Sequence, residues 1–174
     1  MGLFDRFKKN NVIIENNIQS FEETINLIIQ KNKLWEKEEM IEYLKNINLS
    51  DEASYYFKAE FLKKDNLNLD NFRLLSFNEI VKENVSLAPG AIISRFGFIV
   101  VGVNNEGNAI CIDVCNLQND VYLAEHNILC DIYYLDKSNN KVKYDRKSVK
   151  QKLIPINKTF DKYLNSILEK YDNK

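Results

Sequence analysis

The sequence predicts an α+β fold with N-terminal helices, a central and mainly antiparallel sheet of four to five strands, and a C-terminal helix packed on that sheet. Apolar residues recur at helical spacing in the first third and at the C-terminus, whereas the middle alternates short β-branched and aromatic runs with turn residues. The order helices, sheet, helix is typical of this class. With 174 residues, 45% of them hydrophobic, the chain suits one domain. We expect residues 1–15 to form a flexible tail or docking helix, and residues 16–174 the domain.

The helical layer is indicated by caps followed by apolar residues three and four positions apart. Residues 20–23 (Ser-Phe-Glu-Glu) fit a capping box, so we expect a first helix there. A second helix is expected over residues 35–46, and a third from about residue 50. The apolar stripe of the second helix consists of Met40, Tyr43, Leu44 and Ile47. A polar stretch, residues 63–71, separates this layer from the sheet.

The sheet is indicated by short runs rich in β-branched and aromatic residues. A short strand at residues 72–76 leads into a brief helix, which Ser76 and Glu79 are placed to cap. Turn-forming residues at 104–108 connect the next two runs as a hairpin loop. Consecutive short connections predict an antiparallel meander. The remaining expected strands are residues 96–103, 109–114, 121–125 and 128–135, with a shorter segment at 141–144.

The C-terminal helix has the most regular pattern in the chain. Its apolar residues follow the i, i+4, i+7, i+8, i+11 series, which places them on one face. Thr159 or Asn157 is positioned to cap it, and Pro155 blocks its extension backwards. These apolar residues are Phe160, Leu164, Ile167, Leu168 and Tyr171.

Charge and hydropathy exclude several classes of protein. The net charge of −1 offers no overall field to attract nucleic acid, so we expect no specific nucleic-acid partner. Apolar runs fall far short of the roughly 20 residues that span a bilayer, and charges interrupt the N-terminus, so we expect no membrane span and a cytoplasmic location. Residues 141–152 carry a net charge of +5, which is typical of a solvated connection, although a basic hairpin tip can also touch phosphates.

Three Cys and one His raise a zinc hypothesis, which the strand geometry disfavours. Zinc thiolates lie within about 4 Å of each other. Cys111 and Cys115 are four residues apart on an expected strand, so roughly 13 Å separates them. We therefore expect no metal, no cofactor and no catalytic residues, with Cys111, Cys115 and Cys130 as reduced thiols and His126 outside any Cys–His pair. A small hydrolase or metal protein using Asp113, Glu125 and His126 remains a weaker alternative.

Several segments from Leu74 onward resemble, in order, the motifs of one family. The family motifs are a "leucine, small residue, x, x, Glu-Ile" entry, a central hairpin whose second strand ends in aspartate, a strand with a "His-Asp/Glu" end, and a "Ser/Thr-Phe-x-x-Phe-Leu" helix. The matching segments are residues 74–80, 98–102, 105–113, 121–122, 125–127 and 156–164. Over roughly residues 74–170 the chain thus resembles the SUKH superfamily, which includes bacterial toxin-immunity proteins and a yeast cell-wall-synthesis regulator.

The resemblance implies a protein that binds and neutralises a cognate bacterial polymorphic toxin, a nuclease or another intracellular effector, without catalysis. A non-enzymatic regulatory or scaffold module of the same fold is the alternative. Such a partner surface needs a few desolvated anchors within a polar rim. The candidate partner-binding residues are Asn104, Asn105, Glu106, Asn108, Asp120, Glu125 and His126. Asp113 is expected to satisfy backbone donors near the sheet edge.

Overall fold

The fold is built on an antiparallel sheet whose strands follow one another in chain order. The structure, a computed structural model, describes residues 34–47, 67–69, 71–116, 118–127 and 144–172. Among these residues the sheet has six strands, each antiparallel to the next. The strands are β1 (Leu67–Leu69), β2 (Phe72–Leu74), β3 (Phe98–Asn104), β4 (Ala109–Asp113), β5 (Asp120–Ala124) and β6 (Ile154–Thr159). This meander and its helices confirm the predicted α+β class.

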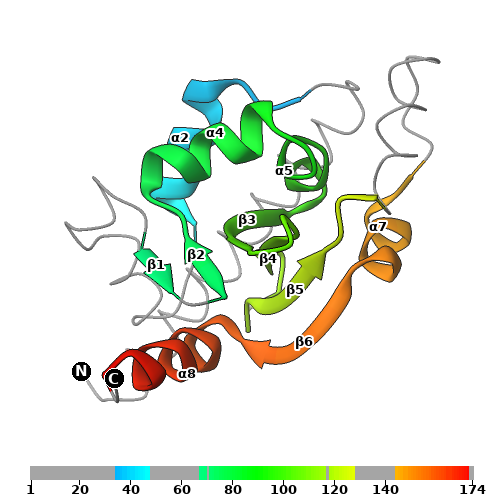
Figure 1. Cartoon of the computed structure of the whole chain (residues 1–174). Coiled ribbons are helices and arrows are strands. Elements are labelled where there is room, and N and C mark those ends of the chain that lie inside the picture. Colours follow the sequence, from blue (N-terminus) through cyan, green and yellow to red (C-terminus); the bar gives the residue numbers. More distant parts are fainter. Residues whose placement is uncertain (1–33, 48–66, 70, 117, 128–143, 173–174) are drawn as a thin grey trace, which may run out of the picture.

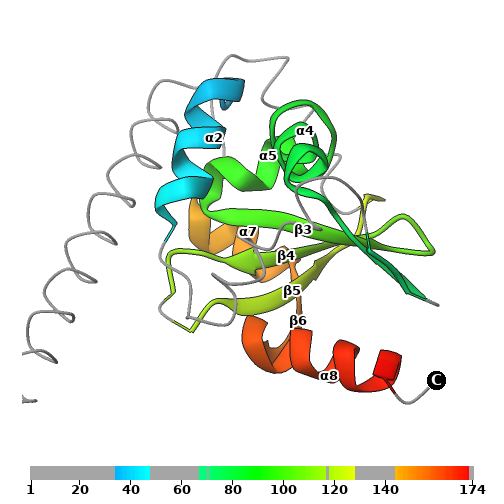
Figure 2. The same ribbon diagram turned by 90° about the vertical axis from the view of Figure 1, so that its left-hand side faces the viewer.

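The helices lie on both sides of the sheet. Figures 1 and 2 show α2 (Lys37–Asn46), α4 (Phe77–Ser86) and α5 (Gly90–Ile93) above it and α8 (Phe160–Asp172) below it. A 3-10 helix, η2 (Ser94–Phe96), joins α5 to β3, and α7 (Arg146–Lys152) precedes β6. The Tyr163 ring of α8 contacts Phe72 of β2 edge to face, with centroids 5.7 Å apart. No helix in the described part of the chain is long and apolar enough to cross a membrane.

The core forms where the central strands pass between the helical layers. The first four residues of β3 have no exposed surface, and all of β4 is buried. Because both faces of these strands are covered, their sequence is continuously apolar instead of alternating. Met40 and Leu44 of α2 and Phe160 and Leu164 of α8 complete the core from the two sides. These burials confirm most of the apolar stripe expected for the second helix, and they confirm Phe160 and Leu164 of the stripe expected for the C-terminal helix.

The cap predicted for α4 is present. The Ser76 Oγ atom accepts a hydrogen bond from the Glu79 backbone N–H at 3.5 Å. In α2, the Glu36 backbone N–H donates to the Glu39 carboxylate at 3.0 Å, so Glu39 satisfies a donor before the first turn. Both helices therefore begin at a side chain that the sequence supplies locally.

Three elements differ from the sequence prediction. β1 forms within the expected polar separator, and β6 includes Pro155 where a helix-blocking connection was expected. β6 is the last strand of the sheet, and an edge strand tolerates a proline because one side of it makes no ladder. The basic run expected to be a solvated connection instead forms α7, which Asp145 caps through the Ser148 N–H at 2.7 Å.

Some predictions fall outside the described residues. They are the N-terminal tail with the start of the domain, the first and third helices, the strand at residues 128–135, and most of the segment at residues 141–144.

Gly102 of β3 pairs with Leu74 of β2 at a position with no room for a side chain, so we predict that Gly102→Ala destabilises the protein by about 2 kcal/mol. A Cβ there would lie 2.4 Å from Phe72 Cε2 and 2.9 Å from the Arg73 carbonyl oxygen. Urea unfolding measures the change. Gly107→Ala is the control, because a Cβ there would meet open space and only the positive φ of 81° is unfavourable for alanine. We expect this variant to lose about 1 kcal/mol of stability. Equal costs at the two glycines would contradict the steric argument.

Candidate functional site

The loop between β3 and β4 is held by its own side chains. Asn104 Oδ1 accepts hydrogen bonds from the backbone N–H of Glu106 at 3.1 Å and of Asn108 at 2.8 Å. Asn108 Nδ2 in turn donates to the Glu106 carboxylate at 3.2 Å. Gly107, with a φ of 81°, makes the reversal possible. Asn105 and Glu106 are exposed, so the loop presents an amide and a carboxylate in a defined conformation.

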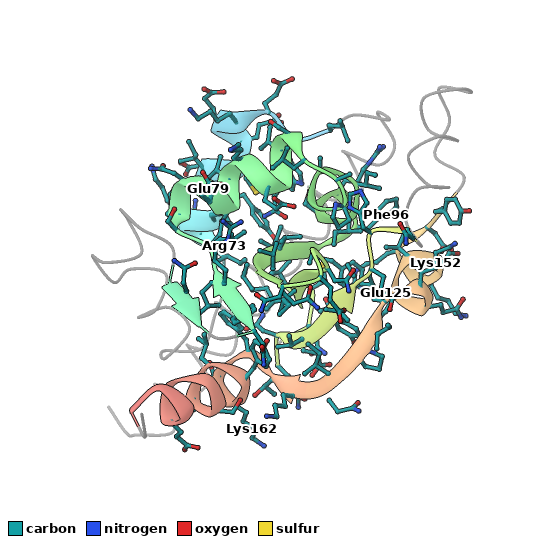
Figure 3. All side chains as sticks on the ribbon, viewed as in Figure 1. Arg73, Glu79, Phe96, Glu125, Lys152 and Lys162 are labelled. Carbon is teal, nitrogen blue, oxygen red and sulfur yellow. The ribbon has the colours of Figure 1, made fainter. Side chains whose placement is uncertain are left out.

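The sheet brings Glu125 and His126 to the same end as this loop. Ala109, the first residue of β4, pairs with Ala124, the last residue of β5. The residues on either side of this pair, Asn108 and Glu125, therefore leave the sheet at the same end. Glu125 is half-buried and His126 is exposed (Glu125 is labelled in Figure 3). Six of the seven predicted partner-binding residues thus gather at one end of the sheet, which we call the hairpin end: Asn104, Asn105, Glu106, Asn108, Glu125 and His126.

Asp120 does not belong to the hairpin end. It begins β5, five residues before Glu125, so about 16 Å of extended chain separates the two. There it pairs with Thr159 of β6 and accepts a hydrogen bond from Asn116 Nδ2 at 2.7 Å. The sheet thus separates Asp120 from the other candidate residues, because the two ends of β5 lie at opposite ends of the sheet.

The strongest electrostatic feature is a buried carboxylate with two cations. Asp113, at the end of β4, has no exposed surface. Its Oδ1 accepts hydrogen bonds from Arg146 Nη2 and from the Cys115 backbone N–H, the latter at 3.1 Å, and its Oδ2 accepts one from Lys150 Nζ at 3.1 Å. The backbone bond agrees with the role expected for Asp113. We call Asp113, Arg146 and Lys150 together the Asp113 cluster. The contacts of the two cations with Asp113 were not predicted from the sequence.

Aromatic rings support the two cations of the Asp113 cluster. The Arg146 guanidinium carbon lies 4.9 Å from the Phe98 ring centroid, and Lys150 Nζ lies 5.4 Å from that of Tyr122. Burial works against the charged form of Arg146, but the Asp113 carboxylate and the Cys115 side chain together outweigh it and raise the Arg146 pKa. Burial also opposes the charge on Lys150, but hydrogen bonds to Tyr122 and Asp113 outweigh it and raise the Lys150 pKa. Both side chains therefore stay cationic.

One signal in the sequence pointed to the cluster. Arg146 and Lys150 are four residues apart, the spacing that places two side chains on one face of a helix. The basic run was instead interpreted as solvated because its partner, Asp113, lies 33 residues earlier than Arg146.

The structure separates the cysteine and carboxylate residues considered for metal binding or catalysis. Cys111 lies within β4 and is fully buried, and burial followed by the Asp113 charge raises its pKa. β4 ends at Asp113, so Cys115 lies in the turn that follows the strand. Cys130 is outside the described residues. Asp113 lies at one end of the antiparallel β4–β5 pair, and Glu125 and His126 follow the other end. These three residues therefore do not share a site. In the described part of the chain, no three His, Cys, Asp or Glu side chains are grouped to hold a metal ion.

The buried Tyr43 of α2 is expected to make the folded state less stable at alkaline pH. Burial, followed by the charges of Cys115 and Asp113, raises the Tyr43 pKa well above its usual value. Above pH about 10 the unfolded chain releases a proton that the folded chain retains, so stability falls as pH rises, by at most about 1.4 kcal/mol per pH unit for this group. We expect Tyr43→Phe to flatten this decline in urea unfolding between pH 9 and 11 on the order of that slope. The same comparison at pH 7 isolates the cost of the lost hydroxyl, and an unchanged alkaline slope would contradict the prediction.

Comparison with known proteins identifies no relative: no protein-family model, no curated protein and no solved structure matches this chain.

Proposed function

We propose that this chain is a cytoplasmic immunity protein, which binds a cognate polymorphic toxin and neutralises it by covering a surface of the toxin, without a catalytic step. The resemblance to SUKH immunity proteins supports the proposal. The residues that carry it lie in β2 and α4, in the β3–β4 hairpin, in and just after β5, and in β6 and α8. The toxin is a nuclease or another effector that acts inside the cell.

The observation that carries the proposal is the gathering of polar side chains at the hairpin end. The loop contributes Asn105 and Glu106 at exposed positions, and the chain after β5 contributes Glu125 and His126. Hydrogen bonds that the Asn104 side chain accepts and that Asn108 donates order the loop before any partner arrives. An ordered loop loses less conformational entropy on binding, so more of the contact energy appears as affinity.

The experiment is coexpression of the full chain with the toxin encoded by the neighbouring gene. We expect growth to be restored and the two proteins to copurify. The double variant Glu106→Lys, Glu125→Lys reverses two charges at the hairpin end, and we expect it to weaken toxin binding at least tenfold, measured by calorimetry. The matched control, Glu38→Lys with Glu169→Lys, makes the same charge change at exposed positions on α2 and α8 and is expected to protect fully.

Three outcomes would contradict the proposal. Failure of the wild-type chain to restore growth removes the immunity function. Copurification of a host protein without any protection favours the regulatory or scaffold alternative. Stoichiometric metal in the purified protein, or an activity that His126→Ala abolishes, favours a hydrolase or metal protein.

A further inference from the structure

The helix α7 presents cations on a surface apart from the hairpin loop. Val149 has no exposed surface and packs α7 into the core. Arg146 and Lys150, one helical turn apart, retain side-chain exposures of 29% and 38% although both contact Asp113. Lys147 beside them is exposed. We call these three residues, Arg146, Lys147 and Lys150, the α7 cationic face.

Two carboxylates in the described part of the chain contact α7, Asp113 and Asp145, and both are already engaged by groups of this chain. Asp113 accepts hydrogen bonds from two cations and one backbone N–H. Asp145 accepts from the Ser148 N–H at 2.7 Å and from the Ser148 hydroxyl at 2.6 Å, and these bonds lower its pKa. A guanidinium has five N–H donors and an ammonium has three. Donors on the α7 cationic face therefore outnumber the acceptors that α7 and Asp113 supply.

The rings beneath these cations are not available to a ligand. Phe98 has no exposed surface and Tyr122 is 7% exposed, because the strands and the cations cover them. Proteins that bind single-stranded nucleic acid stack its bases on exposed aromatic rings. The rings that support Arg146 and Lys150 are covered, and the nearby Tyr144 ring is half-buried with Lys152 Nζ 5.4 Å from its centroid. The α7 cationic face thus offers mainly charged hydrogen-bond donors, which favours carboxylates over nucleotides as its ligands.

We propose that the α7 cationic face docks a carboxylate-rich surface of a protein partner. The Asp113 tether and the aromatic rings hold Arg146 and Lys150 in place, so little side-chain entropy is lost when carboxylates bind. This inference goes beyond the proposed function, because it concerns residues other than the hairpin end and holds whichever toxin is the partner. Lys147, which has no role in the Asp113 cluster, is the position at which it can be tested without disturbing the fold.

The test is fluorescence anisotropy of the full chain with a fluorescein-labelled oligoglutamate peptide at low salt. We expect saturable binding that weakens as salt is added. Lys147→Glu is expected to weaken it about fivefold, and Lys147→Gln about twofold. Lys162→Glu on α8 makes the same charge change as Lys147→Glu at an exposed site far from Lys152 at the end of α7 (Figure 3), and it is expected to bind like the wild type.

The outcomes separate this proposal from others. No saturable binding, or equal losses for Lys147→Glu and Lys162→Glu, overturns it, because the second result reflects net charge only. A single-stranded oligodeoxynucleotide of equal charge is expected to bind more weakly, and tighter binding with the same dependence on Lys147 assigns the face to nucleic acid instead. Because none of these variants touches the hairpin end, failure here leaves the toxin-neutralisation test unaffected.

Discussion

Replacing Asp113 by Asn is expected to lower the free energy of unfolding by about 3 kcal/mol. The carboxylate is fully buried and is the shared counter-charge of Arg146 and Lys150. Removing one partner of a buried ion pair costs about 3 to 5 kcal/mol because the other charge is left uncompensated. We expect the lower end because both cations are partly exposed and regain some hydration. Urea unfolding at pH 7 measures the loss.

Two further variants separate the charge from the shape of the site. Asp120→Asn makes the same chemical change at a half-buried position whose contact is with the neutral Asn116, so we expect less than about 1 kcal/mol. Adding Arg146→Met to Asp113→Asn removes a cation that the first change left unpaired, so the double variant is expected to be more stable than Asp113→Asn by about 1 kcal/mol. If Asp113→Asn costs no more than Asp120→Asn, the Asp113 cluster contributes nothing to stability.

Asn84→Ala is expected to cost about 3 to 4 kcal/mol. Asn84 of α4 is fully buried, and its side-chain amide bonds to both backbone groups of Val100 at 2.8 Å. β2 runs beside β3 only as far as the pairing of Leu74 with Gly102 and a bond from Leu75 to Val101, so the Asn84 amide replaces the missing strand at Val100. Alanine would leave a buried N–H and a buried C=O without partners, at about 1 to 3 kcal/mol each.

Asn46→Ala provides the matched control for this prediction. Asn46 Nδ2 bonds to the Glu42 carbonyl at 2.9 Å, just as Asn84 Nδ2 bonds to the Ile80 carbonyl at 2.8 Å. Asn46 is exposed, however, and its other described hydrogen bond goes to the Glu42 carboxylate at 2.8 Å. We expect a change below about 0.5 kcal/mol. Chemical denaturation of both variants gives the difference, and similar losses would show that the bonds to Val100 are not what stabilises the fold.

Much of the secondary structure could be predicted because its signals are local. Ser76 and Glu79 lie three residues apart and mark the start of α4, and the spacing of Phe160 and Leu164 marks the buried face of α8. The hairpin loop was predictable because Asn104 and Gly107 meet the conformational needs of a reversal within five residues. Most of the candidate site followed from the antiparallel meander, which returns the chain after β5 to this loop.

The sequence by itself determined the fold class, the central strands, the cap of α4 and the hairpin loop, because each depends on residues close together in the chain. Only the tertiary structure decided that Asp113 meets Arg146 across 33 residues, that Asn84 completes the edge of β3, and that Asp120 lies at the end of β5 opposite to the hairpin end. These contacts depend on strand register and helix placement. A polar residue shows no local sign of its distant partner, since its burial becomes favourable only when the partner arrives.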